Sequence, residues 1–427
     1  MTKKTRTILF LICLFLFLLI APVTIFYSQG FRFDFEAKKI TQTGGLFLKV
    51  FPKSAEIYLD GKLKKKTDFF FGSVLIENLL PKKYKIEVKK EGYLTWEKIL
   101  EIKEQQVTEA KNIILFPESP TFNILTTGVK DFWFSPDEKK IILKEADEKL
   151  WSLKLYDLEK NVKSHLISED DVYSAGADLL NLEFAENSKE ISLEIGMKEQ
   201  AKNFVLNLEK FPPLLTEKEI SPIPQNIITS QNFNAENYYL DNSGHLFKNG
   251  EKLTRESFPV KPETEYVLKI FSNFVFLQEG QTLYQLNPES KSFEKFFEQI
   301  KNLKISPDLK KIVYFSDYEI WISFLKDADP PTTHLAGDRV FLVRLSEKIG
   351  DCFWLNSNYL VFNAGNKPPH QNFGGGGKIK IAEIDDRDRI NIIDLAEFEN
   401  PEIFFNKSDK KLYLLSNENL YVSGALF

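Results

Sequence analysis

The pattern of apolar and polar positions begins with one long apolar run at residues 7–27, TILFLICLFLFLLIAPVTIFY, which contains no charged residue. About 20 helical residues span roughly 30 Å, the thickness of the hydrocarbon core of a bilayer. We therefore expect a transmembrane helix here. Lys3, Lys4 and Arg6 precede the run, and the positive-inside rule predicts that they stay in the cytoplasm. This orientation predicts a single-pass membrane protein with residues 28–427 outside the cytoplasm.

Two other interpretations of the apolar run stay open, namely a cleaved signal peptide and a buried helix of a soluble protein. A cleaved signal has an apolar core of about 7–15 residues and a small-x-small cleavage site. This run is longer, and Phe26, Tyr27 and Ser28 stand at its end. Cys13 does not fit a lipoprotein site, because bulky Ile12 precedes it inside the run. We carry forward an uncleaved anchor, with a cytoplasmic tip and membrane helix at 1–27 and a juxtamembrane linker at 28–43.

After Gly45 the pattern changes to a two-residue alternation, which is typical of half-buried strands. Residues 46–51 alternate between the two faces of a predicted strand, and so do residues 84–88. Asp60-Gly61 separates two extended runs and predicts a tight hairpin, because both turn positions need positive φ. The lysine-rich stretch 62–66 then belongs to a solvated hairpin strand. Residues 44–117 are thus expected to form a small all-β unit.

Motifs in this unit resemble the PEGA domain in order and spacing. The matching segments are Pro52-Lys-Ser-Ala55, Tyr58-Leu-Asp-Gly61, Thr67, Leu79-Leu-Pro81, Tyr84-Lys-Ile86 and Lys90-Glu-Gly-Tyr93. Ser54, Asp68 and Lys82 stand where that family has glycine, proline and glycine, so the turns there depart from its pattern. The resemblance implies a small β-sandwich that contacts cell-envelope components or proteins, and it carries over no catalytic motif. A stalk without a binding role fits the same residues.

One element recurs in residues 118–427: an aromatic strand, a polar turn and an apolar strand. Full copies stand at 132–143, 182–193, 303–314 and 403–414, a shortened copy at 353–362, and weaker copies at 231–240 and 268–277. A spacing of roughly 35–50 residues is typical of propeller blades. Four-stranded blades packed radially bury one another's faces, which a single blade cannot do alone. We therefore expect a β-propeller of about seven blades at 118–427, with six or eight as alternatives.

The turn in the recurring element, Ser-Pro-Asp-x-Lys-Lys, resembles that of bacterial WD-like propellers of the TolB type. Glu138 and Leu309 stand where that turn has glycine, which puts its geometry in question. A pair of β-sandwiches would explain the strands but not the recurring turn. The predicted fold class is therefore mainly β: an N-terminal transmembrane helix, a small PEGA-like β-sandwich and then the propeller.

Composition excludes some functions and leaves others open. The net charge of −5 is mild for 427 residues, and acidic and basic residues are interspersed, so no basic field for nucleic acid is present. Cys13 and Cys352 are the only cysteines. Cys13 lies in the apolar run, so an intrachain disulfide is not expected. Cys352 lies beside Phe353 and Trp354 and is expected to be a small buried apolar residue.

The sequence offers no convergent catalytic or metal motif. His165, His245, His334 and His370 have no partner at ligand spacing, and no G-x-S-x-G elbow is present. Gly374–Gly377 with Lys378 is not a phosphate loop, since Ile379 replaces the required Ser or Thr, and residues 363–378 are read as a long loop. The acids at 327–329 and 385–388 do not fit an EF-hand and are read as turn residues. Trp151, Trp321 and Trp354 lie within repeat strands and are expected in the core.

These patterns predict no catalytic residue, cofactor or metal site. The expected function is that of a non-enzymatic envelope or surface protein, anchored in the membrane through residues 7–27. Its propeller would bind an envelope protein or a glycan, with the PEGA-like unit as spacer or second contact. Two alternatives stay open. One is a propeller hydrolase or lyase with a site in the central channel, and the other is an architectural subunit of an envelope complex.

Overall fold

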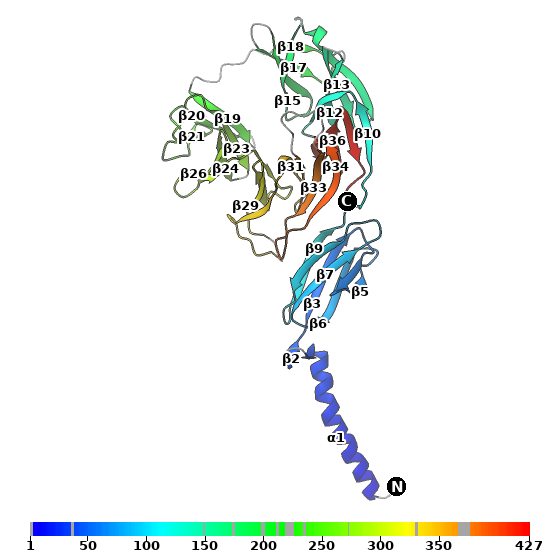
Figure 1. Ribbon diagram of the computed structural model, residues 1–427. Coiled ribbons are helices and arrows are strands. Elements are labelled where there is room, and N and C mark those ends of the chain that lie inside the picture. The colour runs from blue at the N-terminus through cyan, green and yellow to red at the C-terminus, as the bar shows by residue number, and fades with distance from the viewer. Residues whose placement is uncertain are drawn as a thin grey trace.

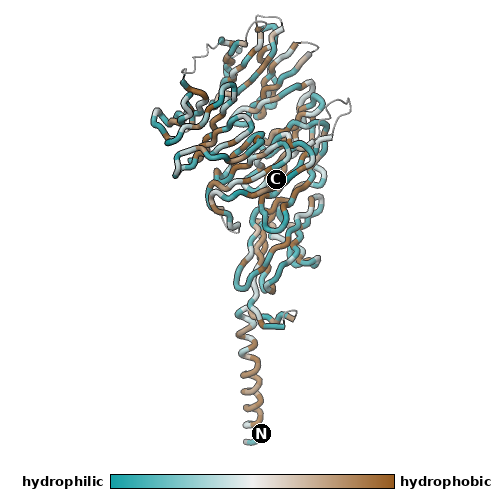
Figure 2. The backbone as a smooth tube through the Cα atoms, turned by 60° about the vertical axis from the view of Figure 1, so that its left-hand side comes forward, coloured by the Kyte–Doolittle hydropathy of each residue, from teal (hydrophilic) through white to brown (hydrophobic). Residues whose placement is uncertain are grey.

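The computed structural model describes residues 3–35, 38–147, 150–172, 176–197, 201–210, 213–217, 226–233, 236–271, 273–328, 332–365 and 376–427. An apolar helix, a two-sheet sandwich and a set of four-stranded sheets follow one another along the molecule (Figure 1). Helix α1 (Lys3–Ser28) is long and apolar enough to cross a membrane. The rest of the chain does not bury its apolar residues. A signal sequence near the N-terminus can meet the same criteria of length and composition. Figure 2 shows that this helix is predominantly hydrophobic, whereas the strands beyond it alternate.

A short hairpin and a two-sheet sandwich follow the helix. The hairpin consists of β1 (Phe31–Asp34) and β2 (Lys39–Gln42). One sheet of the sandwich has the order β6–β3–β9 and the other β5–β4–β7–β8. Their bounds are β3 (Gly44–Phe51), β4 (Glu56–Leu59), β5 (Lys62–Lys66), β6 (Ser73–Leu79), β7 (Lys83–Lys89), β8 (Trp96–Glu101) and β9 (Val107–Ile114). Strands β3 and β9 are parallel, and the other pairs are antiparallel.

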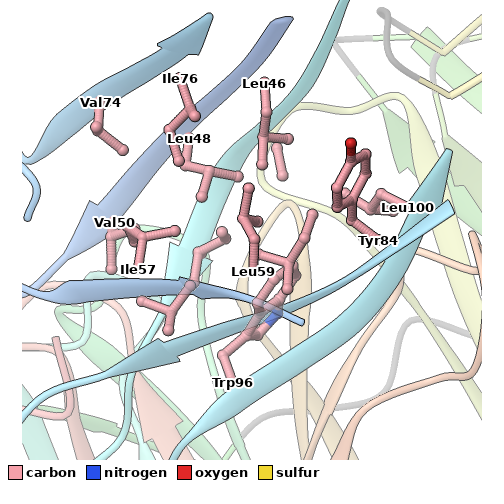
Figure 3. Packing of buried hydrophobic residues seen from close by; sticks show 14 of the residues in the cluster. Leu46, Leu48, Val50, Ile57, Leu59, Val74, Ile76, Tyr84, Trp96 and Leu100 are labelled. Atoms are coloured by element: carbon pink, nitrogen blue, oxygen red, sulfur yellow. The ribbon is translucent and has the colours of Figure 1, made fainter. Parts of the chain in front are cut away.

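The sandwich core consists of the apolar residues that alternate with polar ones along the strands. Leu46, Leu48 and Val50 of β3 are buried and face β4 and β7 across the two sheets (Figure 3), while Lys49 on the same strand is exposed. The hairpin between β4 and β5 turns at Asp60 and Gly61, whose φ values are 49° and 74°. The predicted tight turn is therefore confirmed. All five residues of β5 are exposed, as expected for its lysines.

Seven four-stranded antiparallel sheets make up the described part of the chain after Pro120. Six of them are meanders whose strands follow in chain order, and the seventh has the order β10–β37–β36–β35. The first three sheets along the chain contain β10 (Phe122–Thr127), β11 (Val129–Phe134), β12 (Lys140–Asp147), β13 (Leu150–Asp157), β14 (Val162–Ser168), β15 (Asp178–Phe184), β16 (Glu190–Gly196), β17 (Ala201–Asn207) and β18 (Leu215–Glu217), with a 3₁₀ turn at Glu169–Asp171.

In the described part of the chain four further sheets follow, and the last three strands of the chain complete the sheet that contains β10. Their strands are β19 (Ile227–Phe233), β20 (Glu236–Asp241), β21 (Leu246–Lys248), β22 (Glu251–Lys252), β23 (Tyr266–Phe271), β24 (Phe274–Glu279), β25 (Thr282–Asn287), β26 (Ser292–Phe297), β27 (Asn302–Ile305), β28 (Lys311–Phe315), β29 (Glu319–Phe324), β30 (Arg339–Arg344), β31 (Lys348–Asn356), β32 (Tyr359–Gly365), β33 (Gly376–Glu383), β34 (Ile392–Glu399), β35 (Glu402–Asn406), β36 (Lys411–Ser416) and β37 (Asn419–Ser423).

Neighbouring sheets share buried apolar clusters, which is the packing of a β-propeller. Each of six clusters joins two sheets that are consecutive in this arrangement. Among the described residues, β15–β18 and β19–β22 share no such cluster. Strand β10 pairs with β37 near the other end of the chain, so the sheet that holds both couples the beginning of the propeller to its end.

The recurring turn keeps its shape although glycine is missing from it. Glu138 and Leu309 have φ values of 59° and 57°, in the left-handed region that favours glycine. In both turns the carboxylate holds the loop: Asp137 accepts bonds from the Ser135 hydroxyl and the Lys139 amide. Asp308 accepts the same pair of bonds from the serine and lysine of its own turn. The side-chain hydrogen bonds thus fix the turn without the glycine.

Candidate functional site

The first strand of each four-stranded sheet lies at the inner edge of the propeller. The meander order places β11, β15, β19, β23, β27 and β31 at one edge of their sheets, and β35 has the same place in the sheet that β10 completes. Several of these strands lie beside one another, among them β19 with β23 and β31 with both β27 and β35. These strands therefore occupy the inner edge of the sheets, which is where the central channel of a propeller lies.

A half-buried lysine–carboxylate pair joins two of these inner strands. The Lys304 ammonium on β27 lies 2.7 and 2.8 Å from the two oxygens of Asp351 on β31. The same Nζ lies 3.2 Å from the centroid of the Phe353 ring, which gives a cation–π contact. Burial lowers the pKa of Lys304, and the charge of Asp351 opposes that effect. The pair thus holds a cation at a half-buried position, in contact with an aromatic ring.

A second lysine extends this group along the channel. The Lys269 ammonium on β23 donates to the Asn302 side-chain oxygen at 2.9 Å. Burial lowers the pKa of Lys269, and the nearby charge of Lys304 lowers it further. Two partly desolvated cations therefore lie near each other, and Lys304 is ion-paired with Asp351. An incoming anion would compensate this excess of positive charge.

The backbone and neighbouring rings hold the group in place. The Asp351 amide donates to the Asn363 side-chain oxygen at 2.7 Å, and the Asn363 amide group donates to the Pro401 carbonyl at 2.6 Å. Gly350 is required here, since a Cβ would lie 2.2 Å from the nitrogen of Asn363. The Trp354 indole donates to the Lys304 carbonyl at 3.0 Å. These contacts fix the positions of Lys304 and Asp351 before any ligand binds.

A cavity of about 700 Å³ is lined by two members of this group, Asp351 and Phe353. Its lining combines aromatic rings with charged and amide groups, including Phe132, Phe353 and Phe404 together with Asp351, Asn363 and Glu402. Phe404 stacks on Phe134 with ring centroids 3.9 Å apart, so its ring is held rigidly. Apolar walls with a few fixed polar groups are typical of ligand sites. The chemistry present suits a segment that carries a carboxylate next to an apolar side chain.

The described histidines lie away from this channel. His165 is on β14 near Asp171, and His245 next to β21 contacts Thr254 and Lys252. His334 stacks on Phe324 and contacts Asp386 at 3.1 Å. His370 lies outside the described residues, as do Asp329 and most of the predicted loop at 363–378. No group of three or more possible metal ligands is found among the described residues.

The acidic segment 385–388 lies in the contact between the sandwich and the propeller. The Arg387 guanidinium binds the Asp385 carboxylate at 2.7 Å and donates to the Glu109 carbonyl of β9 at 2.9 Å. The Asp388 carboxylate accepts from the Ile99 amide of β8 at 2.8 Å. Burial acts to raise the pKa of Asp385, but Arg387 and Lys98 outweigh it and hold that pKa below its usual value. The acids thus do more than shape a turn.

A fully buried lysine completes this junction. Lys98 of β8 has no exposed surface, and its ammonium lies 3.2 Å from Oε2 of Glu383 on β33. The Trp96 indole and the Asn391 amide donate to the same oxygen at 3.0 and 2.9 Å. Burial raises the pKa of Glu383, and the charge of Lys98 opposes the rise. This pair could not be predicted from the sequence. Lys98 lies on the buried face of β8, and the alternation of that strand does not indicate which partner a buried lysine has.

The tryptophans and Cys352 lie where the sequence predicts. Trp151, Trp354 and Cys352 are buried, and Trp321 is half-buried among Tyr314, Phe297 and Phe341. Burial raises the pKa of the Cys352 thiol well above its usual value, so it stays protonated. This cysteine is a packing residue.

Three solved structures illustrate the similarity of the chain to known propellers. A structure of YCF48 bound to a D1 peptide shares 13% identity over 72% of this chain and 96% of that one, with a TM-score of 0.38. The Cps50 (Swd1) β-propeller domain of Myceliophteria thermophila shares 11% identity over 71% and 99%, with a TM-score of 0.38. TolB from Acinetobacter baumannii shares 14% over 73% and 60%, with a TM-score of 0.29. No family model and no curated protein matches the chain.

These similarities extend to the fold alone, and the propeller class follows from the sheets described above. The resemblance of residues 44–117 to the PEGA domain rests on the sequence motifs, since no family model matches.

Proposed function

We propose that this protein is a membrane-anchored β-propeller that binds a protein partner in its central channel. The observation that carries the proposal is the pair Lys304–Asp351 against Phe353, beside a cavity of about 700 Å³. An Asp or Glu side chain of the partner would bind near Lys269 and relieve the repulsion between the two lysines. An apolar neighbour in the same segment would pack on Phe353 and Phe404.

The proposed organisation follows the order of the elements. Residues 1–27 form a cytoplasmic tip and transmembrane anchor, and 28–43 form a linker. Residues 44–117 form a PEGA-like sandwich, and 118–427 form a propeller of seven blades, one for each four-stranded sheet. The orientation rests on Lys4 and Arg6 before the apolar helix, which the positive-inside rule places in the cytoplasm. The sandwich then acts as a spacer that holds the propeller outside the cytoplasm, at the envelope or cell surface.

A peptide array of defined sequences tests the channel. The full chain in lipid nanodiscs is applied to peptides with and without acidic residues beside apolar ones. We expect acidic-apolar peptides to bind, and Lys269→Met to weaken binding at least 10-fold, because it removes the cation that meets the carboxylate. Lys139→Met, in the exposed turn between β11 and β12, is the matched control and should leave binding unchanged.

The same material separates the alternatives. Binding that Lys269→Met does not change would contradict the channel site. Capture of glycans bearing uronic acids, in place of peptides, would make the ligand a carbohydrate. Turnover of a bound peptide or glycan would favour the hydrolase or lyase alternative. Stoichiometric co-purification with one envelope protein that Lys269→Met leaves intact would favour an architectural subunit.

A further inference from the structure

The loop between β5 and β6 presents three consecutive phenylalanines to solvent. Phe69, Phe70 and Phe71 are 74–75% exposed, and the first two rings pack edge to face with centroids 5.6 Å apart. Exposed apolar side chains that stand singly are common on proteins, but a contiguous group marks an interaction site. We call residues 68–72 the phenylalanine loop.

Hydrogen bonds hold the backbone of this loop, although its phenylalanine side chains are exposed to solvent. The Asp68 carboxylate accepts hydrogen bonds from the amides of Phe70 and Phe71 and from both the amide and the hydroxyl of Ser73. The Gly72 carbonyl accepts from the Val50 amide at 2.8 Å, which ties the loop to β3. Gly72 has φ of 67°, and a Cβ there would lie 2.4 Å from the Val50 carbonyl oxygen.

The hydrogen bonds that hold the phenylalanine loop do not involve the phenylalanine side chains. A polar side chain at any of the three positions would leave every one of these backbone bonds intact. The turn therefore does not require phenylalanine. Aromatic anchors that are held in place before binding lose little conformational entropy on association, and buried aromatics dominate the energy of many interfaces. The loop has the properties of an anchor that inserts into a pocket.

Lysines surround the phenylalanine loop. Lys49 pairs with Ser73 across β3 and β6, and Lys53 packs beside Gly72. Neither forms a salt bridge with any residue that the structure describes. Lys66 directly precedes the loop and binds Glu56, and the Lys90 ammonium contacts the Lys53 carbonyl at 2.6 Å. The rim is thus positive, because the Asp68 carboxylate is already taken up by the loop backbone.

The loop lies at the end of the sandwich opposite the apolar helix. Strand β3 starts beside the hairpin at Gly44, which pairs with Leu79, whereas Lys49 pairs with Ser73 next to the loop. At about 3.3 Å per strand residue, the loop lies about 20 Å beyond the start of the sandwich. The membrane that holds α1 is therefore at the wrong end to receive these side chains, which favours a protein partner.

The geometry points to a docking site: the phenylalanine loop inserts into an apolar pocket of a partner protein whose rim carries Asp or Glu side chains. The apolar pocket takes up the rings of Phe70 and Phe71, and the acidic rim pairs with Lys49 and Lys53. This site is separate from the channel, and its existence does not depend on the proposed function.

Site-specific photocrosslinking tests this assignment in the full chain. Benzoylphenylalanine replaces Phe70 in intact cells that make the protein natively, and mass spectrometry locates the crosslinked peptide. We expect one protein adduct, joined at an apolar pocket with neighbouring carboxylates. Phe71→Ser in the same chain should lower its yield at least 10-fold, and so should the pair Lys49→Glu and Lys53→Glu. The identified partner, made pure, should bind the chain carrying Phe70→Ser and Phe71→Ser at least 30-fold more weakly.

Matched controls make the result decisive. Leu214→Ser with Leu335→Ser removes two other exposed apolar side chains and should leave the adduct unchanged. Lys269→Met should also leave it unchanged, so failure of the channel and failure of the loop are distinguishable. Crosslinking to lipid alone, no adduct above that of benzoylphenylalanine at position 335, or an adduct insensitive to the loop and lysine variants would each overturn the assignment.

Discussion

At the residue scale, strained backbone conformations are held in place by hydrogen bonds from neighbouring side chains. Leu309 adopts φ of 57° although a left-handed conformation disfavours a side chain with a Cβ. The Asp308 carboxylate and the Ser306 hydroxyl hold the turn in this shape. The same turn around Glu138 shows that the hydrogen bonds, and not glycine, define it. Sequence patterns located both turns but left their geometry in question, because the compensation comes from side-chain bonds.

Leu309→Gly tests this strain. Glycine removes a left-handed penalty of roughly 1–2 kcal/mol but loses about 0.4–1 kcal/mol through the entropy of the unfolded chain. We expect the free energy of unfolding of the full chain to rise by about 0.5–1 kcal/mol. Chemical denaturation in detergent measures it. Leu309→Ala keeps the Cβ and is the control, so an equal gain from alanine would contradict the argument.

The phenylalanine loop should depend on pH through Asp68. Hydrogen bonds from the Phe71 amide and from Ser73 lower the pKa of Asp68 to about 2, below its usual 3.8. A lowered pKa means that the carboxylate stabilises the folded loop above pH 3.8 and that this contribution is lost as pH falls toward 2. Hydrogen exchange should show protected amides at Phe70 and Phe71 at pH 5 and loss of protection between pH 4 and 2.

Asp68→Asn is the matched variant for this experiment. It removes the charge at every pH, so the two amides should be poorly protected at pH 5 already. Equal protection in both proteins at pH 5 would show that Asp68 does not hold the loop.

At the scale of elements, the helix, the strand alternation and the Asp60-Gly61 hairpin could be predicted because each depends on neighbours in the sequence. The pairing of β10 with β37 could not, since about 300 residues separate the two strands. The channel group could not be predicted either. Lys269, Lys304 and Asp351 come from three sheets, and only the packing of those sheets brings them together.

The junction between sandwich and propeller belongs to this scale, because Lys98 joins β8 to β33. Lys98→Met would leave the buried Glu383 without its cation. Removing one partner of a buried ion pair costs about 3–5 kcal/mol. We expect the variant to unfold at lower denaturant concentration and to expose residues 115–121, between β9 and β10, to limited proteolysis.

The double variant Lys98→Met with Glu383→Gln is the control for that experiment. It removes both charges, so most of the lost stability should return. A double variant as unstable as Lys98→Met alone would show that packing of the lysine stem, and not the buried charge, holds the junction.

At the scale of the molecule, the sandwich lies between the apolar helix and the propeller (Figure 1), and in the proposed function it is the stalk that holds the propeller away from the membrane. The junction at Lys98 and Arg387 fixes the propeller to the sandwich, and the sandwich follows the apolar helix after a short hairpin (Figure 1). The channel and the phenylalanine loop then offer two separate contacts to partners in the same compartment. The proposed orientation places that compartment outside the cytoplasm.

Labelling of one introduced cysteine tests this claim most directly. Cys13 lies in the apolar helix and Cys352 is fully buried, so a membrane-impermeant maleimide should react only with the exposed position in Leu335→Cys. We expect labelling in cells whose inner membrane is intact, with outer membranes permeabilised where present, and the label should stay in the membrane fraction. Labelling only after rupture of the inner membrane would contradict the orientation, and label released into the soluble fraction would show that the helix is cleaved.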